Sequence, residues 1–233
     1  MPLASRTAIV MPVYNAPEAF LRAALESVET ILGAVLDISR LDTGSMKARM
    51  TSVPLNDLLK RIETDFAPMA QEKNLDLVVM PTSLTVRSDP NLLRRLIQNL
   101  VSNAIKYTLK GKVVVGARRR GGEVVIQVTD SGIGIPASKF RTVFKEFARL
   151  DEGAKTASGL GLGLSIVDRL SRMLHHPVQL ISTPGKGTTF RIHLTREGDR
   201  VAPAKSGGPI ANPAASDRLQ GVRVLTNMLP GDR

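Results

Sequence analysis

The stretch from Asp89 to about Tyr107, DPNLLRRLIQNLVSNAIKY, constrains the fold more than any other part of the chain. Asp89 is a good helix N-cap and Pro90 suits the first helical position, so the stretch is predicted to be a helix. Its apolar residues recur at the spacing of one buried helical face, at Leu93, Ile97, Leu100 and Ala104. We therefore expect a long helix at the centre of a packed domain.

A polar stripe runs beside this buried face. Asn99, Asn103 and Lys106 follow one another at spacings of four and three residues, with Tyr107 next to them. A carboxamide oxygen is a hard, neutral ligand that suits Mg²⁺, and a lysine ammonium suits phosphate. The stripe is either a site for a metal and a phosphate or an ordinary solvated face, and this helix alone does not decide between them.

Composition limits the class of protein. The 233 residues suffice for one domain with extensions or for two small domains. Because aromatic residues make up only 3% against 42% hydrophobic residues, we expect an aliphatic core. The absence of cysteine excludes disulfides and thiolate metal sites and fits a reducing, cytoplasmic location. No apolar stretch reaches the roughly 18 residues of a membrane span, so none is expected.

The formal charge of +11 raises the question of nucleic acid as a partner. The basic residues are scattered, and their one cluster, residues 118–120, precedes Gly121-Gly122 between two strand-like runs. We interpret that cluster as the rim of a hairpin. Aromatic residues are also too few for base stacking, so no nucleic-acid partner is expected.

Hydrophobic patterns divide the rest of the chain. A helix over residues 17–41 carries a coiled-coil seam of Leu21, Leu25, Val28, Leu32 and Val35. Residues 135–160 are predicted to be a long mobile segment, and residues 197–218 a flexible linker. Two more helices are expected at 54–71 and 162–174, and strands at 75–80, 84–88, 112–118, 123–130, 178–183 and 188–195.

Two glycine-rich motifs suggest a ligand site. Asp130 closes a strand and is followed by Ser-Gly-Ile-Gly-Ile-Pro. Its carboxylate can accept a hydrogen bond from an exocyclic amine, while Gly132 and Gly134 let the backbone approach a flat ring closely. Residues 158–165, SGLGLGLS, lead into a helix, whose first backbone N–H groups favour an anion. Each motif alone also fits an ordinary turn or loop.

Together the motifs are more specific. NLVSNAIKY, DSGIGIP, FKEF and GLGLGL, in this order, resemble the N, G1, F and G2 boxes of the ATP-binding domain of sensor histidine kinases. The wider superfamily includes a chaperone, type II topoisomerases and mismatch-repair ATPases. The resemblance places this domain at residues 52–196. It implies an α+β fold, a two-layer α/β sandwich of the Bergerat type with a mixed sheet packed on helices, preceded by a long coiled-coil-like helix.

The resemblance also implies roles for individual residues. Asp130 would accept from the adenine amine of ATP, and Asn103 would hold Mg²⁺, with Asn99 one turn before it. Lys106 and Tyr107 would contact the phosphate and ribose side. Phe144 and Phe147 would anchor a lid over the phosphates. The remaining ATP-binding residues form the base pocket or the hinge of the lid, and these are Gly132, Gly134, Ile135, Gly159, Leu160, Gly161, Leu162, Gly163, Leu164 and Thr188.

A histidine protein kinase of a two-component phosphorelay is the function implied. It would bind Mg-ATP and donate the γ-phosphate to a histidine. Hydrolysing relatives in the superfamily carry a glutamate at the position of Asn99, and an amide is not a base, which favours a phosphoryl donor over an ATPase. The alternative is an ATP-binding module that docks on a partner without phosphotransfer.

The flanks resemble other parts of such kinases. Residues 18–44 resemble the second helix of the dimerisation hairpin, and residues 219–233 the start of a receiver domain. The helix with the acceptor histidine is not found, so no catalytic residue is assigned and self-phosphorylation is doubtful. Kinase dimerisation helices or a receiver domain are the expected partners, and any homodimer should be weak.

The histidines of the chain fall outside the dimerisation helix. His175 and His176 end a predicted helix, where a cationic imidazole suits the helix dipole, and His193 lies in the last predicted strand. At the other end of the chain, residues 8–28 resemble the opening strand and helix of family-2 glycosyltransferases. No acidic metal-binding motif of that family follows, so residues 1–17 are interpreted as a leader of unclear origin.

Overall fold

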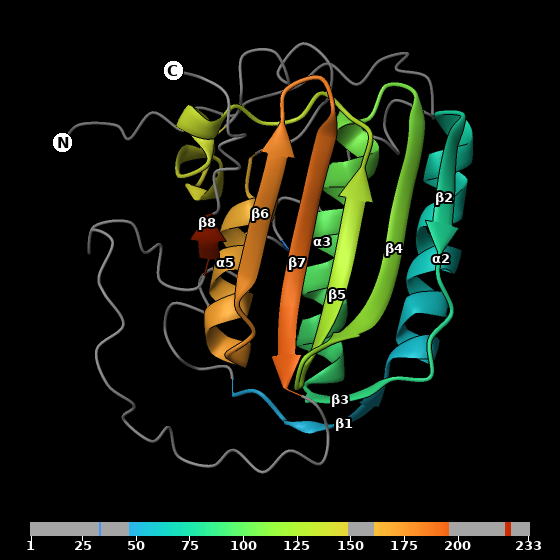
Figure 1. The fold of residues 1–233 in the computed structure, drawn as a ribbon, viewed down its shortest axis with the longest axis vertical. Helices are drawn as coiled ribbons and strands as arrows, with labels where there is room; N and C mark the ends of the chain where they lie inside the picture. Colours follow the sequence, from blue (N-terminus) through green and yellow to red (C-terminus); the bar gives the residue numbers. More distant parts are fainter. Residues whose placement is uncertain (1–32, 34–46, 149–160, 196–221, 225–233) are drawn as a thin grey trace, which may run out of the picture.

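The computed structural model describes residues 47–148, 161–195 and 222–224, together with Gly33. These residues form two layers, a mixed sheet and a layer of helices that covers one of its faces (Figure 1). The predicted two-layer sandwich is therefore confirmed. The predicted leader, coiled-coil helix and linker lie outside the described residues, apart from Gly33, which is helical. The covering helices are α2 (Leu55–Glu72), α3 (Pro90–Tyr107) and α5 (Gly163–Leu174).

The main sheet has the strand order β2-β4-β5-β7-β6-β8. Two pairs, β2 with β4 and β6 with β8, are parallel, and the others are antiparallel. Both predicted hairpins, β4–β5 and β6–β7, are confirmed. The strands are β2 (Leu75–Val79), β4 (Gly111–Arg120), β5 (Glu123–Asp130), β6 (Val178–Thr183), β7 (Gly187–Thr195) and β8 (Val222–Val224).

The edge strand β8 comes from the stretch interpreted as the start of a receiver domain. In the structure it pairs in parallel with β6, with Arg223 in register with Gln179 (Figure 1). The same polypeptide backbone can therefore extend the sheet of the ATP domain. The receiver-like assignment of residues 219–233 stays a prediction.

Helix α3 follows the sequence prediction closely. The Asp89 carboxylate accepts hydrogen bonds from the backbone N–H groups of Asn91 and Leu92, at 2.9 and 3.0 Å. The predicted apolar face of the helix is buried, and the helix lies behind the middle of the sheet (Figure 1). Each such aliphatic side chain contributes roughly 1.5–3 kcal/mol of hydrophobic stabilisation, so this face anchors the polar stripe beside it.

A second, small sheet was missed by the sequence analysis. Strand β1 (Thr51–Pro54) pairs antiparallel with β3 (Thr85–Ser88), beside the start of α3. Val53 and Val86 are paired and buried against the core. A four-residue strand whose partner lies more than 30 residues away leaves no clear local pattern, which explains the omission.

The mobile segment predicted for residues 135–160 is wrong in its first part. Residues 137–144 form two 3₁₀ turns, η1 (Ala137–Lys139) and η2 (Thr142–Phe144). Phe140, Val143 and Phe144 are buried in the core, and this apolar area offsets the entropy of ordering the segment. The small and charged residues of the segment favour mobility, but the burial of these three apolar side chains outweighs them. Residues 149–160 lie outside the described part of the chain.

The cationic role suggested for His176 is also wrong. His175 is the left-handed C-cap of α5, but His176 turns into the core and is only 2% exposed. Its Nε2 lies 2.8 Å from Oγ of Ser88. Burial lowers the pKa of His176 to about 4, so the imidazole is neutral near pH 7 and packs as a core residue.

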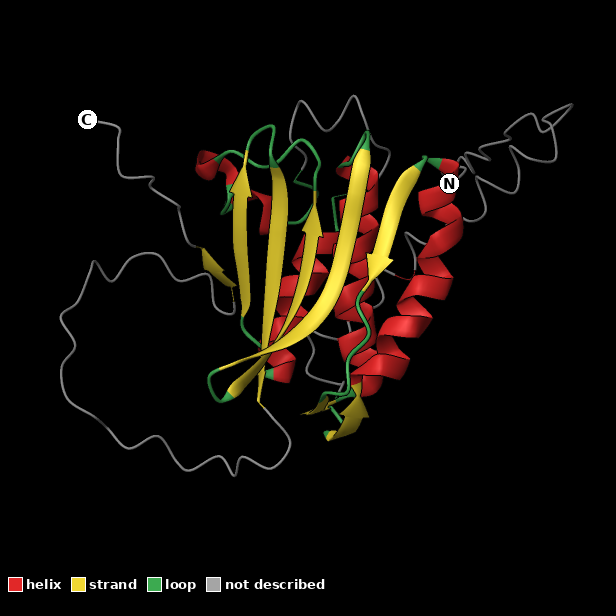
Figure 2. Ribbon diagram, turned by 45° about the vertical axis from the view of Figure 1, so that its right-hand side comes forward, coloured by secondary structure: helices red, strands yellow, loops and turns green. Residues whose placement is uncertain are grey.

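In Figure 2 the helices again lie behind the sheet, whose other face is turned toward the viewer. The helices of the described ranges lack the length and apolar character that crossing a bilayer requires.

Candidate nucleotide-binding site

Asp130 lies at the end of β5 and is only 8% exposed. Its Oδ1 accepts hydrogen bonds from the backbone N–H groups of Gly132, at 2.9 Å, and Thr188, at 3.1 Å. No residue of the described ranges donates to Oδ2. The carboxylate is therefore held rigidly through one oxygen, while the other can accept from a ligand.

The environment of Asp130 changes its ionisation. Burial raises the pKa of its carboxyl from 3.8 to about 6, and the two backbone N–H donors oppose that rise. The group is ionised at neutral pH. Since Oδ1 already accepts two hydrogen bonds, a proton taken up at lower pH would occupy Oδ2 and block the free acceptor.

The turn after Asp130 admits only glycine at two positions. A methyl group built on Gly132 would lie 2.4 Å from the carbonyl oxygen of Tyr107. Gly134 has a φ of +71°, and a methyl group there would lie 2.2 Å from the carbonyl oxygen of Thr183. The turn thus fits between the end of α3 and the end of β6. It brings the predicted site residues Asp130 and Tyr107 together.

Ser182 is a site residue that the sequence analysis missed. Its hydroxyl accepts from the backbone N–H of Ile135 at 2.8 Å and lies 2.9 Å from the hydroxyl of Thr188. It also lies 2.9 Å from the carbonyl oxygen of Gly187, to which it can donate. Ser182 and Thr188 are cross-strand partners in the β6–β7 hairpin, so pairing the two strands would have revealed the link. This hydroxyl pair fixes Ile135 and Thr188 beside Asp130.

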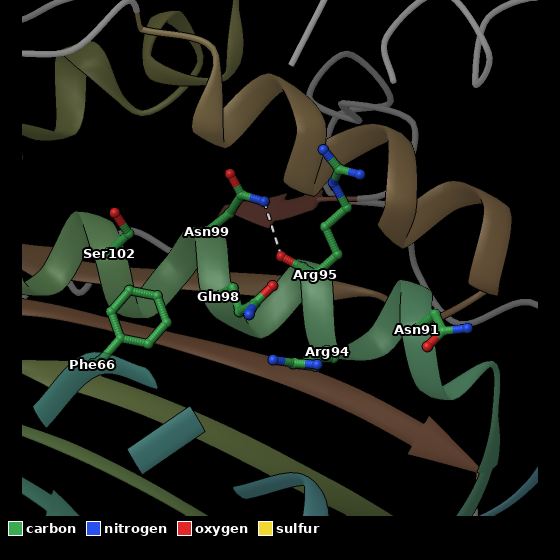
Figure 3. Close-up of a pocket in the computed structure, with 7 residues that line it drawn as sticks. All are labelled: Phe66, Asn91, Arg94, Arg95, Gln98, Asn99 and Ser102. Atoms are coloured by element: carbon green, nitrogen blue, oxygen red, sulfur yellow. Dashed lines mark hydrogen bonds between the residues drawn. The ribbon is translucent and has the colours of Figure 1, made fainter. Parts of the chain in front are cut away.

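The amide stripe of α3 meets the beginning of α5. A methyl group built on Gly163, the first residue of α5, would lie 3.3 Å from Oδ1 of Asn99 and 3.4 Å from both amide atoms of Asn103. Asn99 donates through Nδ2 to the carbonyl oxygen of Arg95 at 2.9 Å, which leaves its Oδ1 as an acceptor (Figure 3). Neutral amide oxygens, a ligand type that suits Mg²⁺, and the N–H groups of a helix N-terminus therefore lie side by side.

The other residues predicted for the phosphate side lie at the end of α3 and around the start of α5. Lys106 and Tyr107 are half-buried, and burial, followed by the charge of Lys73, lowers the pKa of Lys106. Leu162 is buried, and Leu164 packs against the core. Gly161, with a φ of +72°, lies against Ala148, since a methyl group there would be 2.6 Å from the Ala148 carbonyl oxygen. Gly159 and Leu160 lie outside the described residues.

The two phenylalanines of the FKEF motif differ. Phe144 is buried and packs edge-to-face on Phe190, with ring centroids 6.4 Å apart. Phe147 is 64% exposed and has a φ of +58°. Glu146, between them in sequence, forms an ion pair with Arg169 of α5. Phe144 is therefore the anchoring residue of the motif, and Phe147 is not buried by the described residues.

An open groove of about 440 Å³ extends along the outer face of α3 (Figure 3). Asn99 belongs both to this groove and to the amide stripe. Arg94 in the groove forms an ion pair with Asp65 of α2 at 2.7 Å. The groove was not predicted from the sequence. Its lining is mostly polar and consists of Phe66, Asn91, Arg94, Arg95, Gln98, Asn99 and Ser102.

This combination of fold and site defines the class of nucleotide-binding α/β sandwich domains. Comparison with protein families then identifies the particular one. Residues 88–198 match the family described as histidine kinase-, DNA gyrase B-, and HSP90-like ATPase, and the domain belongs to that family.

Its relatives among curated proteins are sensor kinases. The sensor protein GacS of Pseudomonas syringae pv. syringae is 34% identical over 178 residues, which are 72% of this chain and 20% of GacS. The autoinducer 2 sensor kinase/phosphatase LuxQ of Vibrio cholerae is 34% identical over 180 residues, 74% of this chain and 21% of LuxQ. The chain thus spans about a fifth of the length of these relatives.

Solved structures agree with this assignment. The crystal structure of full-length ShkA in complex with AMPPNP superposes with a TM-score of 0.65 at 28% identity. The match covers 76% of this chain and 38% of ShkA. The described domain is therefore a histidine kinase-type ATPase domain of the kind found in sensor kinases.

Proposed function

We propose that this domain binds Mg-ATP between the glycine turn after Asp130, the end of α3 and the start of α5. Bound in this way, it would donate the γ-phosphate to a histidine of a partner in a two-component phosphorelay. The observation that carries the proposal is the Asp130 carboxylate, which is buried and held through Oδ1 with Oδ2 left as an acceptor. Such a group suits the exocyclic amine of adenine, because an unmade hydrogen bond in a buried site costs about 1–3 kcal/mol.

The phosphate side is supported by the chemistry of its residues. The amide oxygens of Asn99 and Asn103 would hold Mg²⁺, and the N–H groups at the start of α5 and the Lys106 ammonium would bind phosphate oxygens. When bound, Mg²⁺ neutralises charge on the phosphates. Asn99 cannot act as a base toward water, which favours transfer to an acceptor over hydrolysis.

The groove along α3 offers an approach for that acceptor. It reaches Asn99, so a helix lying in it would come close to the phosphate side of the site. Its polar lining can form hydrogen bonds with a partner helix, while Phe66 adds apolar contact. Kinase dimerisation helices fit this description, and a receiver domain would be the next partner in the relay.

A test of adenine recognition uses Asp130→Asn. The asparagine oxygen can keep both backbone hydrogen bonds. Its NH₂ group, however, would face the adenine amine, and two hydrogen-bond donors cannot bond each other. We expect ATP affinity, measured by calorimetry, to fall by about tenfold or more. Asp76→Asn, which changes an exposed carboxylate in β2, is the matched control and should bind ATP like the parent. Equal affinity in Asp130→Asn and the parent would refute the assignment.

The metal site is tested with Asn103→Ala. We expect this variant to lose the enhancement of ATP binding by Mg²⁺ while it keeps its affinity for adenosine, which has no phosphates. Asn91→Ala removes an exposed amide from the same helix and should retain the enhancement. Full enhancement in Asn103→Ala would place the metal elsewhere.

A binding module without phosphotransfer is the second candidate, favoured by the lack of an acceptor histidine in the dimerisation-like residues 18–44. Mixing the chain with a full kinase whose own ATP site is inactivated separates the two functions. Phosphohistidine on the partner supports the donor, and its absence despite ATP binding supports the module.

A further inference from the structure

The C-terminal end of α3 has a donor for every one of its last carbonyl groups. The last four carbonyl groups of a helix have no hydrogen-bond partner within the helix, so a capping group or water must supply the donors. Here the carbonyl of Ala104 accepts from the backbone N–H of Thr108, at 3.1 Å, and that of Tyr107 from Ile133, at 3.2 Å. The remaining two, of Ile105 and Lys106, accept from the ammonium of Lys73 at 3.0 and 2.9 Å.

Lys73 reaches this position from outside the helix. It is the C-cap residue of α2 and is followed by Asn74, whose φ of +53° turns the chain into β2. The N–H of Asn74 donates to the carbonyl oxygen of Gln71 at 2.9 Å, which fixes the turn. A cation at a helix C-terminus also interacts favourably with the helix dipole. Lys73, at the end of α2, thus caps the C-terminal end of α3.

The cap from Lys73 bears directly on Lys106, whose own carbonyl oxygen is one of the two that it bonds. A lysine in the last turn of a helix commonly bonds the final carbonyls of that helix. Lys106 lies in the last turn of α3, yet its ammonium makes no hydrogen bond or ion pair with any described residue. Lys73 occupies two of these carbonyls, and its positive charge disfavours a second ammonium beside them.

We propose that Lys73 is a positioning residue for the nucleotide phosphates. By capping the last carbonyls of α3 it keeps Lys106 from capping its own helix, and so leaves that ammonium available to a phosphate. The inference rests on the proposed function, because it takes ATP as the ligand of Lys106. Lys73 itself acts only through Lys106 and the end of α3.

Calorimetry with ATP and with adenosine tests this role. Lys73→Met keeps the aliphatic stem but removes the cap, and we expect ATP affinity to fall about fivefold while adenosine affinity stays unchanged. Lys73→Arg keeps a cationic donor and should recover most of the ATP affinity. Lys60→Met, at an exposed position in α2, is the control for loss of one positive charge and should match the parent.

A double-mutant cycle separates positioning from direct contact. In a Lys106→Met background, Lys73→Met should change ATP affinity by less than about twofold, because its target is gone. An equal loss in both backgrounds, or no loss in either, overturns the proposal. If Lys73→Met does not fold, Lys73→Leu, which is also apolar and has no hydrogen-bond donor, takes its place in the cycle.

The same titrations distinguish this proposal from the one on which it rests. A parent protein that does not bind ATP overturns both. A parent that binds ATP, with Lys73→Met binding equally well, overturns only the role of Lys73.

Discussion

At the scale of single residues, Asp130 shows a conflict between folding and binding. A carboxylate with one unused acceptor oxygen is needed to recognise an amine, but the burial that makes the recognition selective also disfavours the charge. Burial accordingly raises the pKa of Asp130 to about 6. Active and binding sites commonly carry such locally unfavourable groups, and their replacement often stabilises the free protein.

This conflict gives a prediction for the stability of Asp130→Asn. The folded state holds the Asp130 proton more tightly than the unfolded state, whose carboxyl titrates near 3.8. The stability that protonation provides is present at low pH and is lost as pH rises from about 4 to about 6. Asp130→Asn has no such group to titrate. Its free energy of unfolding should therefore exceed that of the parent by up to roughly 3 kcal/mol at pH 8, and by little at pH 3.5.

Denaturant unfolding at several pH values measures this difference. Asp76→Asn serves again as the control, because it makes the same chemical change at an exposed position of β2. A parent more stable than Asp130→Asn at pH 8 would show that Asp130 is not a strained group in the free protein.

Sequence reasoning could find Asp130, Gly132 and Gly134 because their chemistry depends on neighbours along the chain. A strand end and a glycine spacing are local features. Lys73 bonds Lys106 and Ser182 bonds Ile135, which lie 33 and 47 positions away, so neighbours in the sequence do not mark these two contacts. The contact of Ser182 with Thr188 is closer in sequence and follows from the pairing of β6 with β7. The protonation state of His176 follows from its burial. A single sequence does not show which of the residues that end a helix turns into the core.

At the scale of elements, the site depends on how closely α5 approaches α3. Gly163 permits this approach, because a methyl group at that position would already touch the amides of Asn99 and Asn103. Its backbone is helical, so alanine would not strain the helix and would add at most about 1 kcal/mol of helix propensity.

We therefore expect Gly163→Ala to separate stability from binding. Its thermal stability should equal or exceed that of the parent, while its affinity for Mg-ATP falls, because the start of α5 must move away from the amide stripe. Adenosine affinity is the internal control and should be retained, since Asp130 lies on another element. Unchanged Mg-ATP affinity would mean that the start of α5 does not contribute to the phosphate site.

The elements that sequence reasoning predicted well are the long periodic ones. Helices α2, α3 and α5 and the two hairpins repeat their apolar residues often enough to reveal a face. Strand β1 and the turns η1 and η2 are three or four residues long, too short to show a period. Their order comes from contacts with distant parts of the core, such as the pairing of Val53 with Val86.

At the scale of the whole molecule, the fold keeps the histidines of this chain away from the nucleotide site. His176 is buried, and its Nε2 is engaged with Ser88. His193 pairs with Val125 across the sheet, on the face opposite to the one that Asp130 and the helices share, and its ring is bonded to Glu123. His175 follows the last residue of α5, roughly 18 Å along the helix from its N-terminal end.

This arrangement predicts that the chain binds ATP but does not phosphorylate itself on histidine. Phosphoryl transfer depends on positioning the acceptor in line with the γ-phosphate, and the fold holds the three histidines away from that position in their own chain. Incubation with γ-labelled ATP should leave no acid-labile, base-stable phosphate on the chain. Added dimerisation helices that carry an acceptor histidine should become labelled under the same conditions. Stoichiometric phosphohistidine on the isolated chain would contradict this prediction, because it would require one of these three residues to reach the γ-phosphate of a second molecule.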